Sequence, residues 1–397
     1  MIYKTYGKTG LSVSAVGFGG MRFDTSRSNP DNAGLLQYAY DKGINYFDTA
    51  PGYCKDQSED IFGLAFTQMK SQREKFYVST KGMPENCNTA EKSVDAVKKS
   101  LSRLKCDYLD FYYIWCIRRM KVYELAMRPG GQYEGLLRCK EEGLIRHIVI
   151  STHLRGPDVA RIIQKDQFEG VLMGVNILNF LYRWQGVEAA NQAQLGVAAM
   201  NPLAGGIIPK HEKQLAFLAG PDETPTEAAI RFCVSCPQIT ITLVGFTTQS
   251  HIDTACKVAD SAKPFSHKDI QRIRQHITQN MDKLCTGCGY CMGRCPKDIP
   301  VASFMQYYNA KILAGKTDDE MVNELYVQKN WGILVDRNAD AKDCNQCGRC
   351  EMACTQHLDI MRRMETIAAW EKKDRTKYFV KNTIRKLRSF IAGCIRL

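Results

Sequence analysis

The sequence contains no uninterrupted apolar run near the roughly 18 residues that a membrane-spanning helix needs. Its first residues lack the apolar core of a secretory signal. Low-complexity segments are absent, and no internal repeat occurs apart from two cysteine runs. Apolar residues (44%) and charged residues (24%) occur at the levels of soluble domains, so the 397 residues can bury a sizeable core. We therefore expect a cytoplasmic protein with one large domain and one smaller domain.

Acidic residues are scarce near the C-terminal end. From Arg362 to Leu397 the chain has 11 Lys or Arg against 3 Asp or Glu, a net charge of +8 out of the total of +12. Within 378–397, apolar residues recur every three or four positions between basic ones, which is typical of a helix on an anionic membrane surface or against an acidic partner such as a ferredoxin. Packing back onto the protein is the alternative. We expect no nucleic-acid partner, because no binding motif accompanies the charge.

Up to about residue 262, short β-rich apolar runs alternate with segments of helix length, and Asn29, Thr89 and Thr224 are the expected N-caps of three such segments. Eight runs of this kind favour βαβ units that close into a (β/α)8 TIM barrel, with a doubly wound open sheet as the alternative. Either fold places function at the carboxyl ends of the strands. The runs are Val13–Phe18, Tyr46–Asp48, Phe76–Lys81, Tyr108–Trp115, His147–Ser151, Gly170–Val175, Gly196–Met200 and Thr240–Val244.

The alternation stops after residue 262, and the remainder is predicted to be mostly helical. Ser266 is the expected N-cap of a helix through Lys283, and Gly315 and Gly332 interrupt the later helical pattern. We therefore expect a barrel over 1–262, a second domain over 263–361 and a basic tail over 362–397.

The second domain contains two cysteine runs with the same spacing, C-x2-C-x2-C-x3-C. This spacing is typical of proteins with two 4Fe-4S clusters, in which three cysteines of one run and the fourth of the other hold each cluster. It assigns Cys285, Cys288, Cys291 and Cys354 to one cluster, and Cys344, Cys347, Cys350 and Cys295 to the other. Tetrahedral zinc is the alternative, because C-x2-C pairs also bind zinc.

The other nine cysteines form no metal-ligand pattern, and we interpret them as core or surface thiols of a reducing cytosol. They stand at positions 54, 87, 106, 116, 139, 233, 236, 256 and 394.

A second pattern lies at the expected strand ends. The segment Phe47–Tyr53 with Ser58-Glu59, and Val78–Lys81 at the end of the third strand, resemble the signatures of the aldo-keto reductase family. The N-terminal stretch 3–21 resembles the hairpin and first strand of the same family, and the similarity covers roughly residues 1–260. With its cysteine domain, the chain resembles the branch of this family that is fused to a 4Fe-4S ferredoxin-like module. The resemblance implies a (β/α)8 barrel.

The resemblance also implies site residues. Tyr53 would be the general acid that protonates a carbonyl oxygen, Lys81 would lower the pKa of its hydroxyl, and Asp48 would hold the lysine in place. The family's histidine falls five residues after Asp110, where this chain has Trp115. An indole has one N–H donor and no titratable nitrogen, so Trp115 either shapes the substrate pocket or simply packs at the barrel mouth.

The cofactor end departs further from the family pattern. Ser151 keeps the carboxamide-binding serine, whereas Thr152 and Asn176 replace the usual asparagine and glutamine. The phosphate-binding segment, which includes Thr247 and His251, lacks the usual basic pair. NADPH therefore loses its charge-assisted contact, and the site would prefer NADH, bind nicotinamide weakly or hold another group. Flavin stays among the candidates, because a barrel can bind it without a sequence fingerprint.

These features predict an iron–sulfur oxidoreductase of the aldo-keto reductase type. Two 4Fe-4S clusters, with or without NAD(P)H, would exchange electrons with a small substrate in the barrel mouth, and a ferredoxin-like protein is the suggested donor. The competing hypothesis is a non-catalytic electron-transfer or assembly protein with a degenerate barrel. Trp115 and the missing basic pair favour this competitor, and Asp48, Tyr53 and Lys81 oppose it.

Overall fold

The computed structural model describes residues 1–165, 167–280, 284–330, 334 and 339–374. The chain divides into two compact units, Met1–Gln275 and His276–Leu397. The division therefore falls at Gln275, farther along the chain than the 262 expected from the end of the β/α alternation. It lies inside helix α11 (His267–Asn280), whose N-cap is Ser266 as predicted, with the Ser266 hydroxyl accepting from the Asp269 amide at 3.1 Å.

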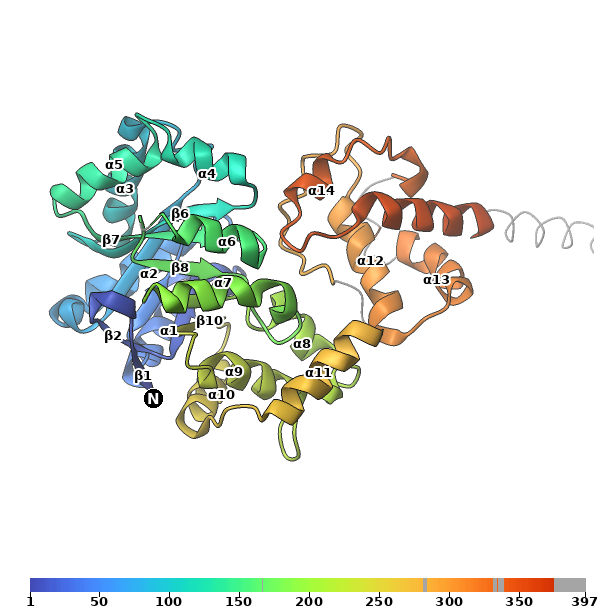
Figure 1. Cartoon of the computed structure of the whole chain (residues 1–397), viewed down its shortest axis with the longest axis horizontal. Coiled ribbons are helices and arrows are strands. Elements are labelled where there is room, and N and C mark those ends of the chain that lie inside the picture. Colours follow the sequence, from blue (N-terminus) through green and yellow to red (C-terminus); the bar gives the residue numbers. More distant parts are fainter. Residues whose placement is uncertain (166, 281–283, 331–333, 335–338, 375–397) are drawn as a thin grey trace, which may run out of the picture. The chain divides into compact units, whose positions relative to one another are not determined.

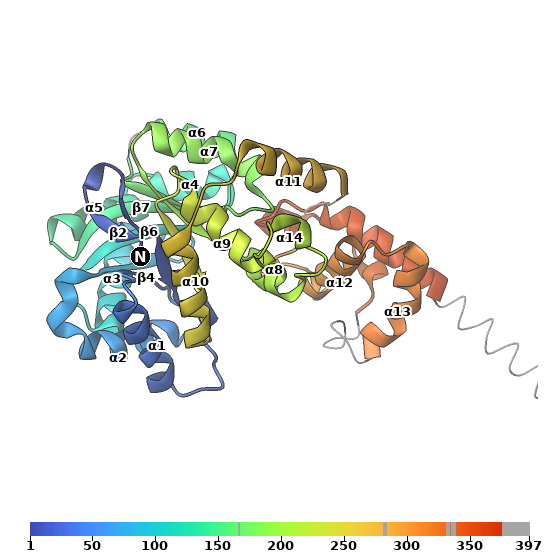
Figure 2. The ribbon, with the colours of Figure 1, turned by 90° about the horizontal axis from the view of Figure 1, so that it is seen from below.

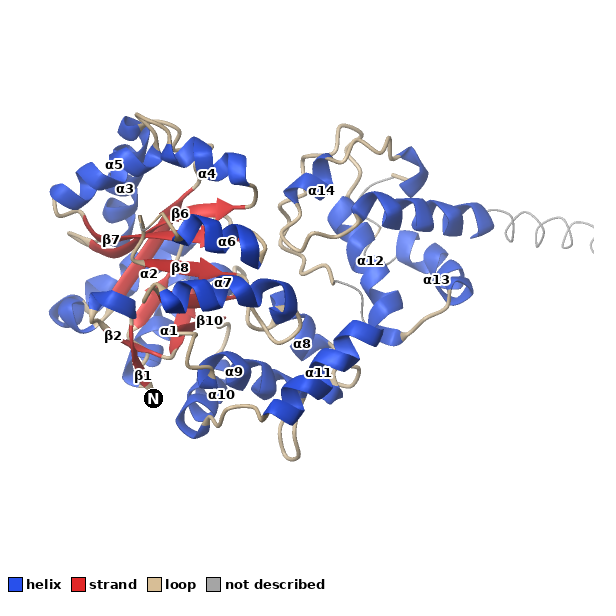
Figure 3. Ribbon diagram, in the orientation of Figure 1, coloured by secondary structure: helices blue, strands red, loops and turns tan. Residues whose placement is uncertain are grey.

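The first unit is a closed barrel of eight parallel strands, as the sequence predicts, in the order β10-β3-β4-β5-β6-β7-β8-β9 (Figures 1 and 3). Strands β4 and β9 match their predicted bounds, and the others differ from them by a few residues at their ends. The strands are β3 (Val16–Gly19), β4 (Tyr46–Asp48), β5 (Tyr77–Gly82), β6 (Leu109–Ile117), β7 (Ile145–Thr152), β8 (Gly170–Met173), β9 (Gly196–Met200) and β10 (Ile241–Gly245).

Helices enclose the strands, and α1 lies beside α2, α6 beside α7, and α9 beside α10 (Figure 2). Thr89 caps α3, and Thr224 forms a capping box with Glu227 at the start of α9, as expected. The cap of α1 is Ser28 rather than Asn29, because the Ser28 hydroxyl accepts from the amide of Asp31. The helices are α1 (Asn29–Asp41), α2 (Ser58–Gln68), α3 (Ala90–Leu104), α4 (Met120–Met127), α5 (Gln132–Glu141), α6 (Gly156–Ile163), α7 (Phe180–Gln192), α8 (Ile207–Lys210), α9 (Pro225–Ser235) and α10 (Gln249–Ser261).

The expected first strand, Val13–Phe18, is divided between two sheets. Its beginning forms β2 (Ser12–Ser14), which pairs with β1 (Tyr3–Thr5) in an antiparallel hairpin, and its end forms β3. Between β1 and β2, Tyr6 is fully buried against the first residues of β8 and β9. A Cβ at Gly170 would come within 2.3 Å of the Tyr6 hydroxyl, and one at Gly196 within 2.3 Å of the Tyr6 ring, so glycine is required at both positions. Tyr6 thus fills the amino-terminal end of the barrel and leaves function to the carboxyl end.

The described residues of the second unit form helices and loops without a strand (Figure 3). Its helices are the end of α11, α12 (Val301–Ala314), α13 (Asp318–Asn330), α14 (Arg349–Ala353) and residues 360–374. Gly315 ends α12 in a left-handed conformation, as predicted, whereas Gly332 lies outside the described residues. Trp370 is buried beside the rings of Tyr307 and Tyr308, at centroid distances of 5.9 and 5.8 Å.

The start of the expected tail, 362–374, thus belongs to a helix that packs within the second unit. The rest of that tail, including the segment 378–397 for which membrane contact was expected, lies outside the described residues. Within the described ranges, none of the helices combines the length and apolar character needed to cross a bilayer.

Candidate active site

Asp48 and Lys81 form a buried ion pair at the carboxyl ends of β4 and β5. The Lys81 ammonium lies 2.6 and 2.8 Å from the two carboxylate oxygens of Asp48, and the two residues are only 1% and 4% exposed. Ser79 pairs with Asp48 across the two strands, and its hydroxyl donates to the same carboxylate at 2.8 Å. The carboxylate is therefore held by a cation and a hydroxyl, as a buried charge requires.

Tyr53 lies on the tightly wound loop that follows β4. The Lys81 ammonium lies 5.2 Å from the centroid of its ring, so the structure brings Asp48, Tyr53 and Lys81 together as the sequence predicts. Three consecutive residues after Tyr53, at positions 54–56, have φ between 53° and 65°, a region that residues other than glycine rarely occupy. The Asp56 carboxylate closes the loop by accepting from the Gly52 amide and from Arg103, each at 2.8 Å. Residues in this strained conformation persist only where surrounding contacts hold them. The contacts of Asp56 therefore fix the loop on which Tyr53 lies.

Trp115 reaches Tyr53 through an irregularity in β6. The strand pairs Ile114 with Ile150 and Ile117 with Thr152, so that Trp115 and Cys116 together oppose one residue of β7. This is a β-bulge, and Cys116 takes the positive φ of 64° that such an extra residue needs. The Trp115 ring stands edge-on to the Tyr53 ring, with centroids 5.5 Å apart and planes at 86°. Trp115 therefore packs directly on the candidate acid.

Burial raises the pKa of the Tyr53 hydroxyl well above its usual value, and the Asp48 carboxylate and two neighbouring thiols raise it further. Arg22 acts in the opposite direction. The sequence predicts that Lys81 lowers this pKa; the net shift is upward because of burial, and the separate effect of Lys81 stays a prediction. The ammonium is paired with Asp48, so the pair presents no net positive charge to the phenol. Tyr53 is therefore protonated throughout the neutral range, as a proton donor must be.

Among the predicted cofactor residues, Ser151 has a buried hydroxyl that is available to a ligand. It is the one residue of β7 that lies opposite the bulge at Trp115 and Cys116, and it is fully buried. Among the described residues, its hydroxyl has no hydrogen-bond partner. A buried hydroxyl without a partner costs free energy, and a ligand carboxamide could satisfy it.

Thr152 and Asn176 are instead committed to local structure. The Thr152 hydroxyl donates to the Ile117 carbonyl and accepts from the Leu154 amide, each at 3.0 Å. The Asn176 side chain donates to the Asn201 carbonyl at 2.9 Å, and its oxygen accepts from the two amides that follow in the turn before α7. Their geometry therefore gives no support to the predicted cofactor contacts of these two residues.

Thr247 and His251 lie together at the start of α10, where the Thr247 hydroxyl and the His251 Nδ1 are 3.0 Å apart. Thr248 caps this helix through the His251 amide, so the segment does begin a helix of 13 residues, as a phosphate site would. Phe246, at one of the positions of the missing basic pair, is fully buried against Phe18.

Sequence analysis missed Arg22, a cation on the loop after β3. A Cβ at Gly245, the last residue of β10, would come within 2.6 Å of the Arg22 side chain, and its guanidinium approaches the Gly205 carbonyl at 3.4 Å. Arg22 also influences the Tyr53 hydroxyl, so it lies beside the candidate site. The only signal was a basic residue following the glycine-rich end of the first strand.

In the second unit, the cysteine spacing predicts two sets of cluster ligands. We call Cys285, Cys288, Cys291 and Cys354 site A, and Cys295, Cys344, Cys347 and Cys350 site B. Burial raises the pKa of the Cys291 thiol to about 12, and the other three thiols of site A, followed by Cys350, raise it further. Burial likewise raises the pKa of Cys350 to about 11, with added effects from Cys344 and Cys295 of site B.

The two cysteine runs also share a backbone conformation. Counted from the first cysteine, the third, fifth and fourteenth residues of both runs have positive φ, although only some of them are glycine. The matched pairs are Gly287 (65°) with Gln346 (58°), Gly289 (76°) with Gly348 (70°), and Asp298 (51°) with His357 (53°). The repeat seen in the spacing is therefore a repeat in the structure.

No three His, Cys, Asp or Glu side chains in the described part of the chain converge as ligands of a single metal ion would. The cysteines within the described ranges form no disulfide either. The geometry of the described residues therefore supports neither the zinc alternative nor the two 4Fe-4S clusters, and the cluster assignment stays a prediction.

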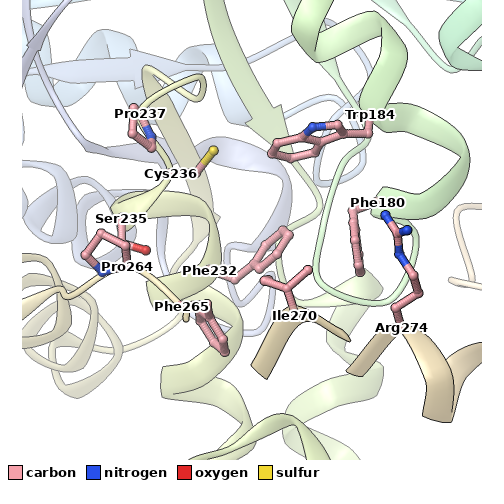
Figure 4. Close-up of a pocket in the computed structure, with 10 residues that line it drawn as sticks. All are labelled: Phe180, Trp184, Phe232, Ser235, Cys236, Pro237, Pro264, Phe265, Ile270 and Arg274. Carbon is pink, nitrogen blue, oxygen red and sulfur yellow. The ribbon is translucent and has the colours of Figure 1, made fainter. Parts of the chain in front are cut away.

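A separate cavity lies on the outer helical layer of the first unit, and none of the candidate site residues lines it (Figure 4). It encloses about 250 Å³ between α7, α9 and the start of α11. Its aromatic lining residues are Phe180, Trp184, Phe232 and Phe265.

Known proteins resemble this chain over more than half of its length. The pattern of the Aldo/keto reductase family matches residues 15–278. An uncharacterized oxidoreductase of Bacillus subtilis, YqkF, is 24% identical over 311 residues, which cover 70% of this chain and 97% of that protein. The L-galactose dehydrogenase of Arabidopsis thaliana is 27% identical over 255 residues, 58% of this chain and 75% of that enzyme.

Among solved structures, the holo form of the aldo-keto reductase AKR11C1 from Bacillus halodurans has the same fold, with a TM-score of 0.59 and 22% sequence identity over 69% of this chain and 96% of that one. The family pattern spans more than half of the chain, and the closed barrel carries the ion pair and the tyrosine at its strand ends. This chain therefore belongs to the aldo/keto reductase family.

Proposed function

We propose that the protein is an oxidoreductase that reduces a small carbonyl substrate in the barrel mouth, with Tyr53 as the general acid, nicotinamide as the hydride source and two 4Fe-4S clusters in the second unit. The observation that carries the catalytic part is the buried Asp48–Lys81 pair, which lies directly beside the Tyr53 ring. In the reduction, the carbonyl carbon gains two electrons and a proton, Tyr53 gives a second proton to the oxygen, and solvent reprotonates the phenolate.

Nicotinamide is the proposed hydride source, and the unpartnered Ser151 hydroxyl opposite the β6 bulge is the feature that suits its carboxamide. Bound in the barrel mouth, it would supply two electrons and one proton as hydride. The phosphate-binding segment lacks the basic pair that is usual in the family. Arg22, beside the end of β10, would supply a positive charge for the cofactor instead. NADH would then be favoured over NADPH, because the described start of α10 carries no arginine or lysine to meet a 2′-phosphate.

The second unit suits two 4Fe-4S clusters. In a cubane, each thiolate binds a different iron, so the four sulfurs need not converge on one point as the ligands of a single ion do. The matched left-handed positions support one common binding mode for both runs. Thr286, between the first two cysteines of site A, is 7% exposed, and its hydroxyl has no partner among the described residues. A cluster sulfur would accept from it.

A second candidate function is a non-catalytic electron-transfer or assembly protein. The observations that favour it are the internal bonding of Thr152 and Asn176 and the bulk of Trp115 against Tyr53.

The deciding experiment is anaerobic purification, followed by iron and sulfide analysis and by titration with NADH, NADPH and flavin. We expect about eight irons and eight sulfides per chain, and reduction of 4-nitrobenzaldehyde with NADH. Cys354→Ala should halve the iron content. The control is Cys236→Ala, which changes a barrel cysteine that also stands in a C-x2-C pair, with Cys233, and it should leave the iron content unchanged. Iron-free protein would refute the cluster proposal. Clusters that only dithionite or a ferredoxin reduces, without turnover, would favour the second candidate.

Trp115→His should raise kcat/KM for 4-nitrobenzaldehyde by about tenfold or more, because an imidazole is smaller than an indole and has a titratable nitrogen that can bond a substrate oxygen. The matched control is Trp184→His, which changes a tryptophan on the outer cavity of the same unit. An unchanged or lower kcat/KM for Trp115→His alone would mean that the indole serves the natural reaction.

A further inference from the structure

Sites A and B differ in what surrounds their sulfurs, although their spacing is the same. Cys347 of site B is exposed, and Pro296, which follows the fourth cysteine of the first run, is exposed as well. Each site has one buried cysteine, Cys285 in site A and Cys350 in site B, but none of the four cysteines of site A is exposed. Thr355, which follows the fourth cysteine of the second run, is 1% exposed. An electron donor in solution can therefore approach site B more closely than site A.

Thr355 places a hydroxyl at site A where the first run has a proline. Its oxygen lies 3.3 Å from the sulfur of Cys288, within hydrogen-bond reach for sulfur. Proline at the matching position has neither an N–H nor a hydroxyl to offer. A second donor reaches site A from the backbone, because the Leu358 amide donates to the Cys354 sulfur at 3.5 Å.

Arg363 adds a buried positive charge to the same site. It lies on the helix 360–374, is 3% exposed, and stacks over the Tyr308 ring at 4.7 Å. The next residue of α12, Asn309, holds the backbone of Cys285 from both sides, accepting from its amide at 2.9 Å and donating to its carbonyl at 2.7 Å. Two neighbouring residues of α12 therefore contact the Arg363 side chain and the Cys285 backbone.

We propose that Arg363 and Thr355 raise the reduction potential of the site A cluster, so that electrons taken up at the exposed site B pass on to site A. This inference rests on the proposed function, because it needs the clusters to be present. Reduction adds one electron to a cluster that is already anionic, and burial alone would disfavour that extra charge. A buried guanidinium and hydrogen bonds to the sulfurs stabilise it, and both are found at site A.

The test is a redox titration of the complete, cluster-loaded protein, followed by electron paramagnetic resonance. The wild type should show two reduction waves. Arg363→Met and Thr355→Val should each move the same wave to lower potential and leave the other in place, and the double variant should move it farther. Thr355→Ser, which keeps the hydroxyl, should restore the wild-type value. Arg362→Met removes a charge from the exposed neighbouring position and should move neither wave.

The iron content distinguishes a failure of the cluster assignment from a failure of the role proposed for Arg363 and Thr355. Wild-type protein without iron would overturn the cluster assignment itself. With about eight irons in wild type and variants, unchanged potentials, equal shifts of both waves, or the same shift for Arg362→Met would overturn the role of Arg363 and Thr355 and leave the clusters standing. If Arg363→Met does not fold, the Thr355→Val and Thr355→Ser pair decides alone.

Discussion

Replacing Tyr53 with phenylalanine is expected to lower kcat for 4-nitrobenzaldehyde reduction by about 10²- to 10⁴-fold, the usual contribution of a positioned general acid. The ring stays in place, because its edge-on contact with Trp115 and its approach to Lys81 involve the aromatic face and not the hydroxyl. Substrate binding should therefore change little, so that the loss appears in kcat more than in KM. The measurement is steady-state kinetics with NADH under anaerobic conditions.

Tyr112→Phe is the matched control for this change. Tyr112 is fully buried on β6, and its hydroxyl has no partner among the described residues, so its removal deletes the same atom away from the ion pair. Wild-type activity is expected for Tyr112→Phe. Equal losses in both variants, or full activity of Tyr53→Phe, would remove Tyr53 from its proposed role.

The pH profile gives an independent check on the same residue. A general acid works in its protonated form, and the pKa of the Tyr53 hydroxyl is raised by burial and by Asp48. A raised pKa keeps the acid protonated to higher pH, so kcat/KM should not fall on the alkaline side until well above the usual tyrosine range near 10. A fall near neutrality would mean that a phenolate-stabilising charge, as first expected from Lys81, acts on Tyr53 after all.

The sequence was sufficient to predict the barrel, because alternation of apolar runs and helical segments has few other solutions in a chain of this length. It also predicted the meeting of Asp48, Tyr53 and Lys81, since the carboxyl ends of neighbouring parallel strands must lie together. The direction of the Tyr53 pKa shift could not be predicted, because it depends first on how deeply the phenol is buried and then on the charges around it.

Three other misses have different physical causes. Asn176 resembles a cofactor ligand in sequence, but its amide completes the turn before α7 and bonds Asn201 across the loops. The bulge in β6 has no sequence signal, because the residue with positive φ is Cys116 and not glycine. Arg22 is separated from the β10 loops by more than two hundred residues, so only the closed barrel brings them together.

Breaking the Asp48–Lys81 pair should give the largest loss of stability in the barrel. Asp48→Asn leaves the Lys81 ammonium, 1% exposed, without its counter-charge, and the removal of one partner of a buried pair costs about 3–5 kcal/mol. Lys81→Met should cost a similar amount, because the Asp48 carboxylate would keep only the Ser79 hydroxyl. The measurement is urea unfolding of each variant, followed by circular dichroism, with midpoint and slope fitted separately.

The double variant Asp48→Asn/Lys81→Met distinguishes stability from catalysis. With both charges removed, no buried charge is left unpaired, so most of the lost stability should return while turnover stays low. Asp158→Asn is the matched control, because the Asp158–Arg161 pair has side chains that are 38% and 68% exposed and should be worth about 0–1 kcal/mol. If Asp48→Asn costs no more than Asp158→Asn, the pair does not hold the strand ends. If the double variant is as unstable as the single ones, the loss comes from packing rather than from charge.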